Sequence, residues 1–233
     1  MERRDFVKLC AASAAASNLP SPSQAATLTA RLYKRAMLVD ERGSPLRVAA
    51  IKPGVNYIFD YPFSATPCFL LRLAQPAAGG IDLRTEANEI YRWEGGVGAD
   101  RNVVAYSAIC AHKMTYPTKQ VSFIGYRDAP SPVAGSGKVI TCCSDRSVYD
   151  PSAGARVVSG PAPQPLATIL LEYDAKNDEL FAVGTFGGEM FAEFFRKYEF
   201  RLHLELGDRA KITVEKTAVV KELASYSTQW AQC

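Results

Sequence analysis

The chain has 233 residues, 48% of them hydrophobic and 10% aromatic, which is enough to bury a core in one domain with additions or in two small domains. Its net charge of +3, from 27 basic and 24 acidic residues, is not that of a nucleic-acid-binding protein and favours a protein or small-molecule partner. The six cysteines are too few and too scattered for the disulfide framework of a small secreted domain.

The first 26 residues have the features of an export signal. The pair Arg3 and Arg4 precedes a weakly apolar stretch over residues 9–17, and residues 20–26 supply a helix break and a small-residue cleavage site. This order predicts a twin-arginine (Tat) signal and a periplasmic protein. We favour cleavage over retention as an anchor, because a membrane span needs about 20 strongly apolar residues and this stretch is mostly Ala and Ser.

Short apolar stretches separated by Gly, Pro and Asp follow from Leu32 onward, a pattern typical of antiparallel β-structure. The stretches are residues 47–51, 56–59, 68–73, 103–109, 138–142, 169–173 and 179–183. Asp and Asn tolerate left-handed backbone conformations, so the segment 173–179 predicts a hairpin between the last two. The sequence therefore predicts a mainly β domain over residues 32–186.

The pattern changes in the last part of the chain. Aromatic and apolar residues recur at intervals of three and four within residues 189–199, which predicts an amphipathic helix. The segments expected after it are a strand over 200–206, a strand over 210–214 and a short helix over 219–226. We expect residues 187–233 to form a C-terminal α/β extension that docks to a partner or covers the main domain.

Two motifs that contain cysteine each follow a predicted strand. The first is Cys110-Ala111-His112 and the second is Cys142-Cys143-Ser144-Asp145. Thiolate sulfur suits iron held by bridging sulfides, whereas imidazole and carboxylate are harder donors suited to a second iron. The only other histidine, His203, is expected to be a half-exposed residue on a strand and not a ligand.

With their flanking residues, these motifs resemble the loops of the Rieske [2Fe-2S] family, which have the patterns C-x-H and C-x-x-H. The flanking residues that resemble the family are 104–109 before the first motif. After the second motif they are Ser147, Tyr149, Gly154 and the proline-rich segment 159–166. The resemblance covers roughly residues 32–186 and implies a Rieske-type antiparallel β-sandwich with two cluster-binding loops.

The resemblance also implies the ligands of a [2Fe-2S] cluster. Cys110 and Cys142 would bind the buried iron, and His112 would bind the exposed iron. Asp145 occupies the position of the second histidine. Cys143, directly after Cys142, stays open as an alternative ligand.

Two polar residues of the second loop match hydrogen-bond donors of the family. Ser147 resembles the hydroxyl that bonds a bridging sulfide, and Tyr149 resembles the phenol that bonds the sulfur of the first cysteine. The family's disulfide between the two loops is missing, because its positions hold Thr115 and Ser144. Loss of both partners together indicates a site that works without this bridge.

Three other features carry weaker expectations. Arg146, after the aspartate, either offsets its charge, marks a docking surface or is simply solvated. Residues 113–141, rich in Pro and Gly, look like an insertion that covers the cluster or reaches a partner. Cys68 and Cys233 are expected to be a buried thiol and a flexible terminal residue, with a mutual disulfide as the alternative.

The resemblance implies an electron-transfer subunit and not a stand-alone catalyst, similar to the Tat-exported small Rieske subunits of periplasmic oxidoreductases such as arsenite oxidase. It would relay single electrons between a larger redox subunit and a cytochrome or quinone-linked partner, at the periplasmic face of the inner membrane. The added negative charge of an aspartate ligand lowers the reduction potential and disfavours direct quinol oxidation. The alternatives are a cluster-less structural subunit with disulfides and a mononuclear zinc or iron site.

Overall fold

The computed structural model describes residues 26–233, so the predicted Tat signal lies outside the described residues apart from Ala26. Within this range, no helix is both long enough and apolar enough to cross a membrane.

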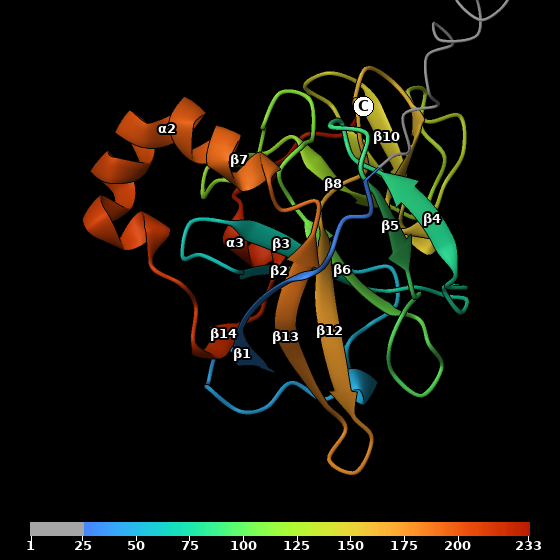
Figure 1. Ribbon diagram of the computed structural model, residues 1–233, viewed down its shortest axis with the longest axis vertical. Helices are drawn as coiled ribbons and strands as arrows, with labels where there is room; N and C mark the ends of the chain where they lie inside the picture. Colours follow the sequence, from blue (N-terminus) through green and yellow to red (C-terminus); the bar gives the residue numbers. More distant parts are fainter. Residues whose placement is uncertain (1–25) are drawn as a thin grey trace, which may run out of the picture.

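The core of the protein is an eight-stranded sheet (Figure 1). Its strands, in spatial order, are β14 (Lys216–Val219), β1 (Arg31–Val39), β13 (Glu179–Phe186), β12 (Thr168–Asp174), β6 (Val103–Ser107), β3 (Pro67–Arg72), β2 (Tyr57–Asp60) and β15 (Lys221–Glu222). Neighbouring strands are antiparallel except β1 and β14, which are parallel. Strands β12 and β13 form the predicted hairpin, with Asp174 paired to Glu179.

A single short segment of the tail completes both edges of this sheet. Strand β14 pairs with β1 at one edge, β15 pairs with β2 at the other, and only Val220 separates β14 from β15. The Val220 N–H also donates to the Val39 carbonyl over 2.8 Å. Because consecutive residues close both edges, the sheet is barrel-like. The prediction of a mainly β fold is confirmed.

Buried aromatic and aliphatic side chains fill the barrel. Phe69 and Leu70 on β3 and Tyr106 on β6 have no exposed surface. The Tyr106 hydroxyl donates to the Pro151 carbonyl over 2.7 Å, so even this polar group is satisfied inside the core. Burying one such side chain stabilises a fold by roughly 1.5–3 kcal/mol.

The second cysteine motif lies in a smaller antiparallel sheet. Its strands, in spatial order, are β11 (Arg156–Ser159), β10 (Ser147–Asp150), β9 (Val139–Cys142) and β8 (Ile124–Arg127). Two further sheets pair β4 (Ile81–Arg84) with β5 (Ile90–Trp93) and β7 (Val121–Ser122) with β16 (Gln229–Trp230). Residues 113–141, predicted as an insertion loop, thus contain strands of their own.

Short 3-10 helices occupy three connections. They are η1 (Val48–Ala50), η2 (Pro151–Ala153) and η3 (Gly207–Lys211). The predicted strands over residues 47–51 and 210–214 are therefore wrong for the most part. The helix η1 occupies the middle of the first segment, and in the second η3 covers residues 210–211 while Thr213 forms only an isolated bridge with Phe63.

The predicted helix of the tail exists but is longer than expected. Helix α2 spans Met190–Leu206, so the strand predicted over 200–206 is wrong. Leu202 is buried and Leu206 half-buried, four residues apart, and they continue the apolar face of the helix, whereas Phe200 and Leu204 are exposed. The short helix α3 (Leu223–Tyr226) begins later than predicted, after β15.

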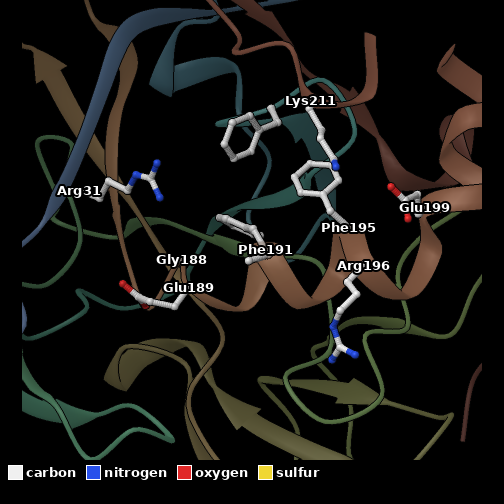
Figure 2. A pocket seen from close by; sticks show the side chains of 10 residues that line it. Arg31, Gly188, Glu189, Phe191, Phe195, Arg196, Glu199 and Lys211 are labelled. Atoms are coloured by element: carbon white, nitrogen blue, oxygen red, sulfur yellow. The ribbon is translucent and has the colours of Figure 1, made fainter. Parts of the chain in front are cut away.

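Helix α2 packs on the barrel through its aromatic residues. The rings of Phe195 and Phe63 meet edge to face, with their centroids 5.4 Å apart. Together with Phe191 they line a surface cavity of about 450 Å³, at whose rim Arg31 and Lys211 lie (Figure 2). Within the same helix, Phe194 and Tyr198 pack on Tyr116, a residue of the first motif's loop, with centroids 5.0 Å from its ring.

Asp60, at the end of β2, gives a prediction about stability and pH. Burial raises its pKa from 3.8 to about 7, and Lys221 opposes this only in part. Between pH 4 and 7 the folded protein therefore holds a proton that the unfolded chain has lost, so its stability falls as pH rises. We expect Asp60→Asn to flatten this dependence and to raise the free energy of unfolding at pH 8 by on the order of 1–3 kcal/mol.

Urea titrations at pH 5 and pH 8 measure this effect. The control is Asp208→Asn, the same substitution at an exposed position. An Asp60→Asn protein whose unfolding free energy has the wild-type pH dependence would contradict the assignment.

Candidate metal centre

The first motif lies in a tight loop after β6. The Cys110 N–H donates to the Thr115 carbonyl over 2.8 Å, and the Met114 N–H donates back to the Cys110 carbonyl over 2.9 Å. Met114 takes the left-handed backbone conformation (φ 56°) that this reversal requires. The two backbone bonds hold Cys110 and His112 on one rigid turn.

The second motif is the turn between β9 and β10. The Arg146 N–H donates to the Cys142 carbonyl over 2.8 Å, and Arg146 is left-handed (φ 64°). The carboxylate of Asp145 accepts the Ser147 N–H through Oδ1 over 3.0 Å. This bond fixes the carboxylate and leaves Oδ2 free to face the first loop.

The structure brings the four predicted ligands together. Sγ of Cys110, Sγ of Cys142 and a carboxylate oxygen of Asp145 lie within 4.8 Å of one another. Asp145 Oδ2 is 3.1 Å from Cys110 Sγ and 3.0 Å from His112 Nδ1. Their role as ligands stays a prediction, but residues 35 positions apart in the chain converge as the motifs indicated.

Burial divides these four residues into an inner and an outer part. Cys110 and Cys142 have no exposed surface, and the side chain of Asp145 is 1% exposed. The imidazole of His112 is 38% exposed. Among the four, His112 is therefore the group through which the site reaches the protein surface.

The two predicted donors also lie at the site. The Tyr149 hydroxyl is 3.4 Å from Cys110 Sγ and accepts the Ala111 N–H over 3.2 Å, so its own proton is available to the sulfur. The Ser147 hydroxyl is buried and has no hydrogen-bond partner among residues 26–233. It is one of nine buried side-chain polar atoms without a partner in the described residues, and it is free to donate to an additional acceptor at the site.

The two thiols share their protons unequally. Contact with Cys142 and the Tyr149 hydroxyl lower the pKa of Cys110, while contact with Cys110 and burial raise that of Cys142. Burial by itself raises the pKa of Asp145, but the Ser147 N–H and the neighbouring thiols and imidazole bring it below its ordinary value. Cys110 is thus the more acidic of the two thiols, and Asp145 is more acidic than an ordinary aspartate.

This donor set fits a metal group. A metal would displace the protons of the two thiols, and its positive charge would compensate thiolates and a carboxylate that are otherwise costly to bury. The buried sulfurs and the more exposed imidazole match the division between two irons that the resemblance implies. The unpartnered Ser147 hydroxyl would be a hydrogen-bond donor to such a group.

Cys143 is not a fourth ligand in this structure. It forms a disulfide with Cys233, with the two Cα atoms 5.6 Å apart. The suggested disulfide between Cys68 and Cys233 is therefore wrong; Cys68 is a buried free thiol that donates to the Tyr61 carbonyl over 2.9 Å. Sequence reasoning missed the true pair because 90 residues separate its members.

The remaining residues singled out from the sequence lie apart from the ligands. His203 is exposed, as expected of a non-ligand, but on helix α2 and not on a strand. Thr115 is half-buried and Ser144 is exposed, so the two loops are joined by non-covalent contacts.

Comparison with known proteins found relatives both among curated proteins and among solved structures. No family model matches the chain. It is 27% identical over 140 residues to the iodate reductase subunit IdrB of Pseudomonas sp. (strain SCT), covering 60% of this chain and 58% of that protein, less than two thirds of its length. Among solved structures it is similar to the soluble domain of the Rieske protein II (soxF) from Sulfolobus acidocaldarius, with 24% identity, a TM-score of 0.45, and coverage of 66% of this chain and 78% of that one.

Proposed function

We propose that this Rieske-like chain carries a [2Fe-2S] cluster and passes single electrons as a subunit of a larger oxidoreductase. The observation that carries the proposal is the convergence of two buried cysteines with a partly exposed histidine and a buried aspartate. The similar protein from Pseudomonas is a subunit of an iodate reductase, which supports a subunit role here.

Cys110 and Cys142 would hold the inner iron, and His112 and Asp145 the outer iron. The cluster, when bound, would supply reversible one-electron chemistry. The Tyr149 phenol stabilises charge on the site by donating to Cys110 Sγ. Ile109 and Ile140, which are close to the two cysteines in the chain, are fully buried. Hydrogen bonds to sulfur favour the more negative, reduced state and so raise the reduction potential.

Asp145 opposes that effect. Its carboxylate adds a negative charge that a second histidine would not, so it favours the oxidised cluster. A protein with this ligand is better suited to relay electrons between a larger redox subunit and a cytochrome than to oxidise quinol directly. The predicted Tat signal supports a periplasmic location, at the periplasmic face of the inner membrane.

Compactness of the site favours a second candidate, a mononuclear metal. Zinc binds sulfur at about 2.3 Å and oxygen at about 2.0–2.2 Å, so one ion can reach three donor atoms as close as those of Cys110, Cys142 and Asp145. The cluster-less alternative with disulfides in the motif has less support, since Cys110 and Cys142 are free thiols and only Cys143 is bonded.

Metal and sulfide analysis of the anaerobically purified, exported protein tests the proposal. We expect about two irons and two acid-labile sulfides per chain, visible absorption, and an EPR signal that develops on reduction. One zinc or iron per chain without sulfide would establish the mononuclear site instead. Protein that is colourless and free of metal would overturn both.

A further inference from the structure

We infer that the C-terminal segment, residues 227–233, is a strap with two roles. It positions the loop that holds the second motif, residues 142–145, and it keeps the Cys143 thiol away from the metal. The strap is joined to the loop covalently, because Cys233 bonds Cys143, the residue directly after Cys142. Figure 1 shows the C-terminus lying beside β10, the strand that leaves this loop. The inference concerns the folded chain and does not depend on which metal group the site binds.

Backbone hydrogen bonds fix the strap along residues 118–122. The N–H groups of Thr228, Gln229 and Ala231 donate to carbonyls of Lys119, Gln120 and Ser122 over 2.9, 3.1 and 2.9 Å. They include the parallel pairing of β16 with β7. The Ser227 hydroxyl adds a bond to the Thr118 carbonyl over 2.6 Å.

Trp230 connects the strap to the sheet that carries the ligands. A Cβ added at Gly125 on β8 would lie only 2.7 Å from the indole nitrogen, so the ring rests directly on the β8 backbone. Strand β8 pairs with β9, where Ile124 is the partner of Cys142. The strap therefore contacts β8, the strand that pairs with β9 beside Cys142.

The loop of the second motif is also held at Cys143, directly after Cys142, by a hydrogen bond to the segment between β7 and β8. The Cys143 N–H donates to the Phe123 carbonyl over 2.7 Å, and Arg127 donates through its guanidinium to the Cys233 carbonyl over 3.0 Å. The disulfide, the indole contact and these bonds all hold Cys143 against the strap, so the loop has support on its outer side. This support compensates for the absence of a bridge between Thr115 and Ser144.

The disulfide also has a chemical consequence. A free Cys143 would be a third thiol one residue from Cys142, able to compete for the metal or to form a disulfide with Cys110 or Cys142. Bonding it to Cys233 removes that competitor. The strap thus has a mechanical role and a protective role, and different variants separate them.

Hydrogen exchange of the metal-free protein tests the mechanical role. Cys143→Ser/Cys233→Ser removes the crosslink without leaving a free thiol, and we expect the amides of Cys143 and Ala231 to exchange about tenfold faster or more. Amides of the β12–β13 hairpin are the internal control and keep their wild-type rates. Unchanged exchange at Cys143 and Ala231 would overturn the mechanical role.

A second set of variants tests the strap without touching a cysteine and covers the case in which the double variant does not fold. Gly125→Ala displaces Trp230, so it should speed exchange of the Ala231 amide, as should Trp230→Ala. In the Trp230→Ala background, Gly125→Ala should have little further effect, since the clash is gone. Equal effects of Gly125→Ala in both backgrounds would show that Trp230 does not transmit the contact.

Thiol mapping tests the protective role. In the wild type we expect a peptide pair joined through Cys143 and Cys233, with Cys110 and Cys142 reactive toward iodoacetamide after unfolding. In Cys233→Ser, purified in air, we expect disulfides that join Cys143 to Cys110 or Cys142, and none in the double variant. Free Cys110 and Cys142 in every variant would overturn the protective role, whereas missing iron with the wild-type thiol map would count against the proposed function alone.

Discussion

A protein in which Cys142 is replaced by alanine is expected to lose at least about nine tenths of its bound iron. Cys142 Sγ is one of two buried thiols at the centre of the candidate site, and among the described residues no third free cysteine lies there to replace it. If the site holds the proposed cluster, Cys110 alone could not anchor the inner iron without this sulfur. The measurement is iron and sulfide content per chain, together with the visible spectrum.

Cys68→Ala is the matched control for this prediction. Cys68 is also a free cysteine with no exposed surface, but it lies on β3 and bonds the Tyr61 carbonyl. Both variants lose a buried sulfur and should lose similar stability, on the order of 1–2 kcal/mol. If Cys142→Ala keeps its iron, or if Cys68→Ala loses it to the same degree, the assignment of the ligands is wrong.

Replacing Asp145 has the second largest expected effect. Asp145→His should raise the midpoint potential, because a neutral imidazole replaces a carboxylate and less negative charge opposes reduction. A change of 1.4 kcal/mol in a one-electron couple corresponds to about 59 mV, so we expect a shift of tens of millivolts or more. Potentiometric titration followed by EPR measures it.

Asp145→Asn separates the charge of this residue from its shape. The amide oxygen can still accept the Ser147 N–H that Asp145 Oδ1 accepts now, so the turn keeps its hydrogen bond. If Asp145 is a ligand, the Asp145→Asn protein should bind the cluster less firmly than the wild type. The Asp145→His protein should bind it firmly again, because imidazole is a ligand. A potential and spectrum that stay at wild-type values in both variants would show that Asp145 is a neighbour of the cluster and not a ligand.

The meeting of the two loops was predictable, because each motif follows a stretch of apolar, β-prone residues and carries its donors at short spacing. The secondary structure of the C-terminal extension was harder to predict. Residues 200–206 alternate apolar and polar like a strand, but they also continue the helical face of α2 through Leu202 and Leu206, and packing on the barrel decides for the helix. Local pattern alone cannot choose between two periods that both fit.

Long-range pairings were beyond sequence reasoning. Nothing in the residues around Cys233 indicates Cys143 as its partner, since both lie in stretches with little periodicity and are distant in the chain. The barrel edges pose the same problem, because β14 and β15 are short and polar. Their pairing depends on which edges the rest of the sheet leaves open.

Edge closure by Lys216–Val219 and Lys221–Glu222 has a consequence for the order of folding. Ala36 pairs with Lys216 and Ile58 with Lys221, so the first two strands of the sheet receive their outer neighbours only after more than 150 further residues have been synthesised. Until then, β1 and β2 each present unpaired backbone groups on which another chain could assemble. Contacts this distant also make folding slow. Until β14 and β15 are in place, the growing chain is therefore open to aggregation through these two edges.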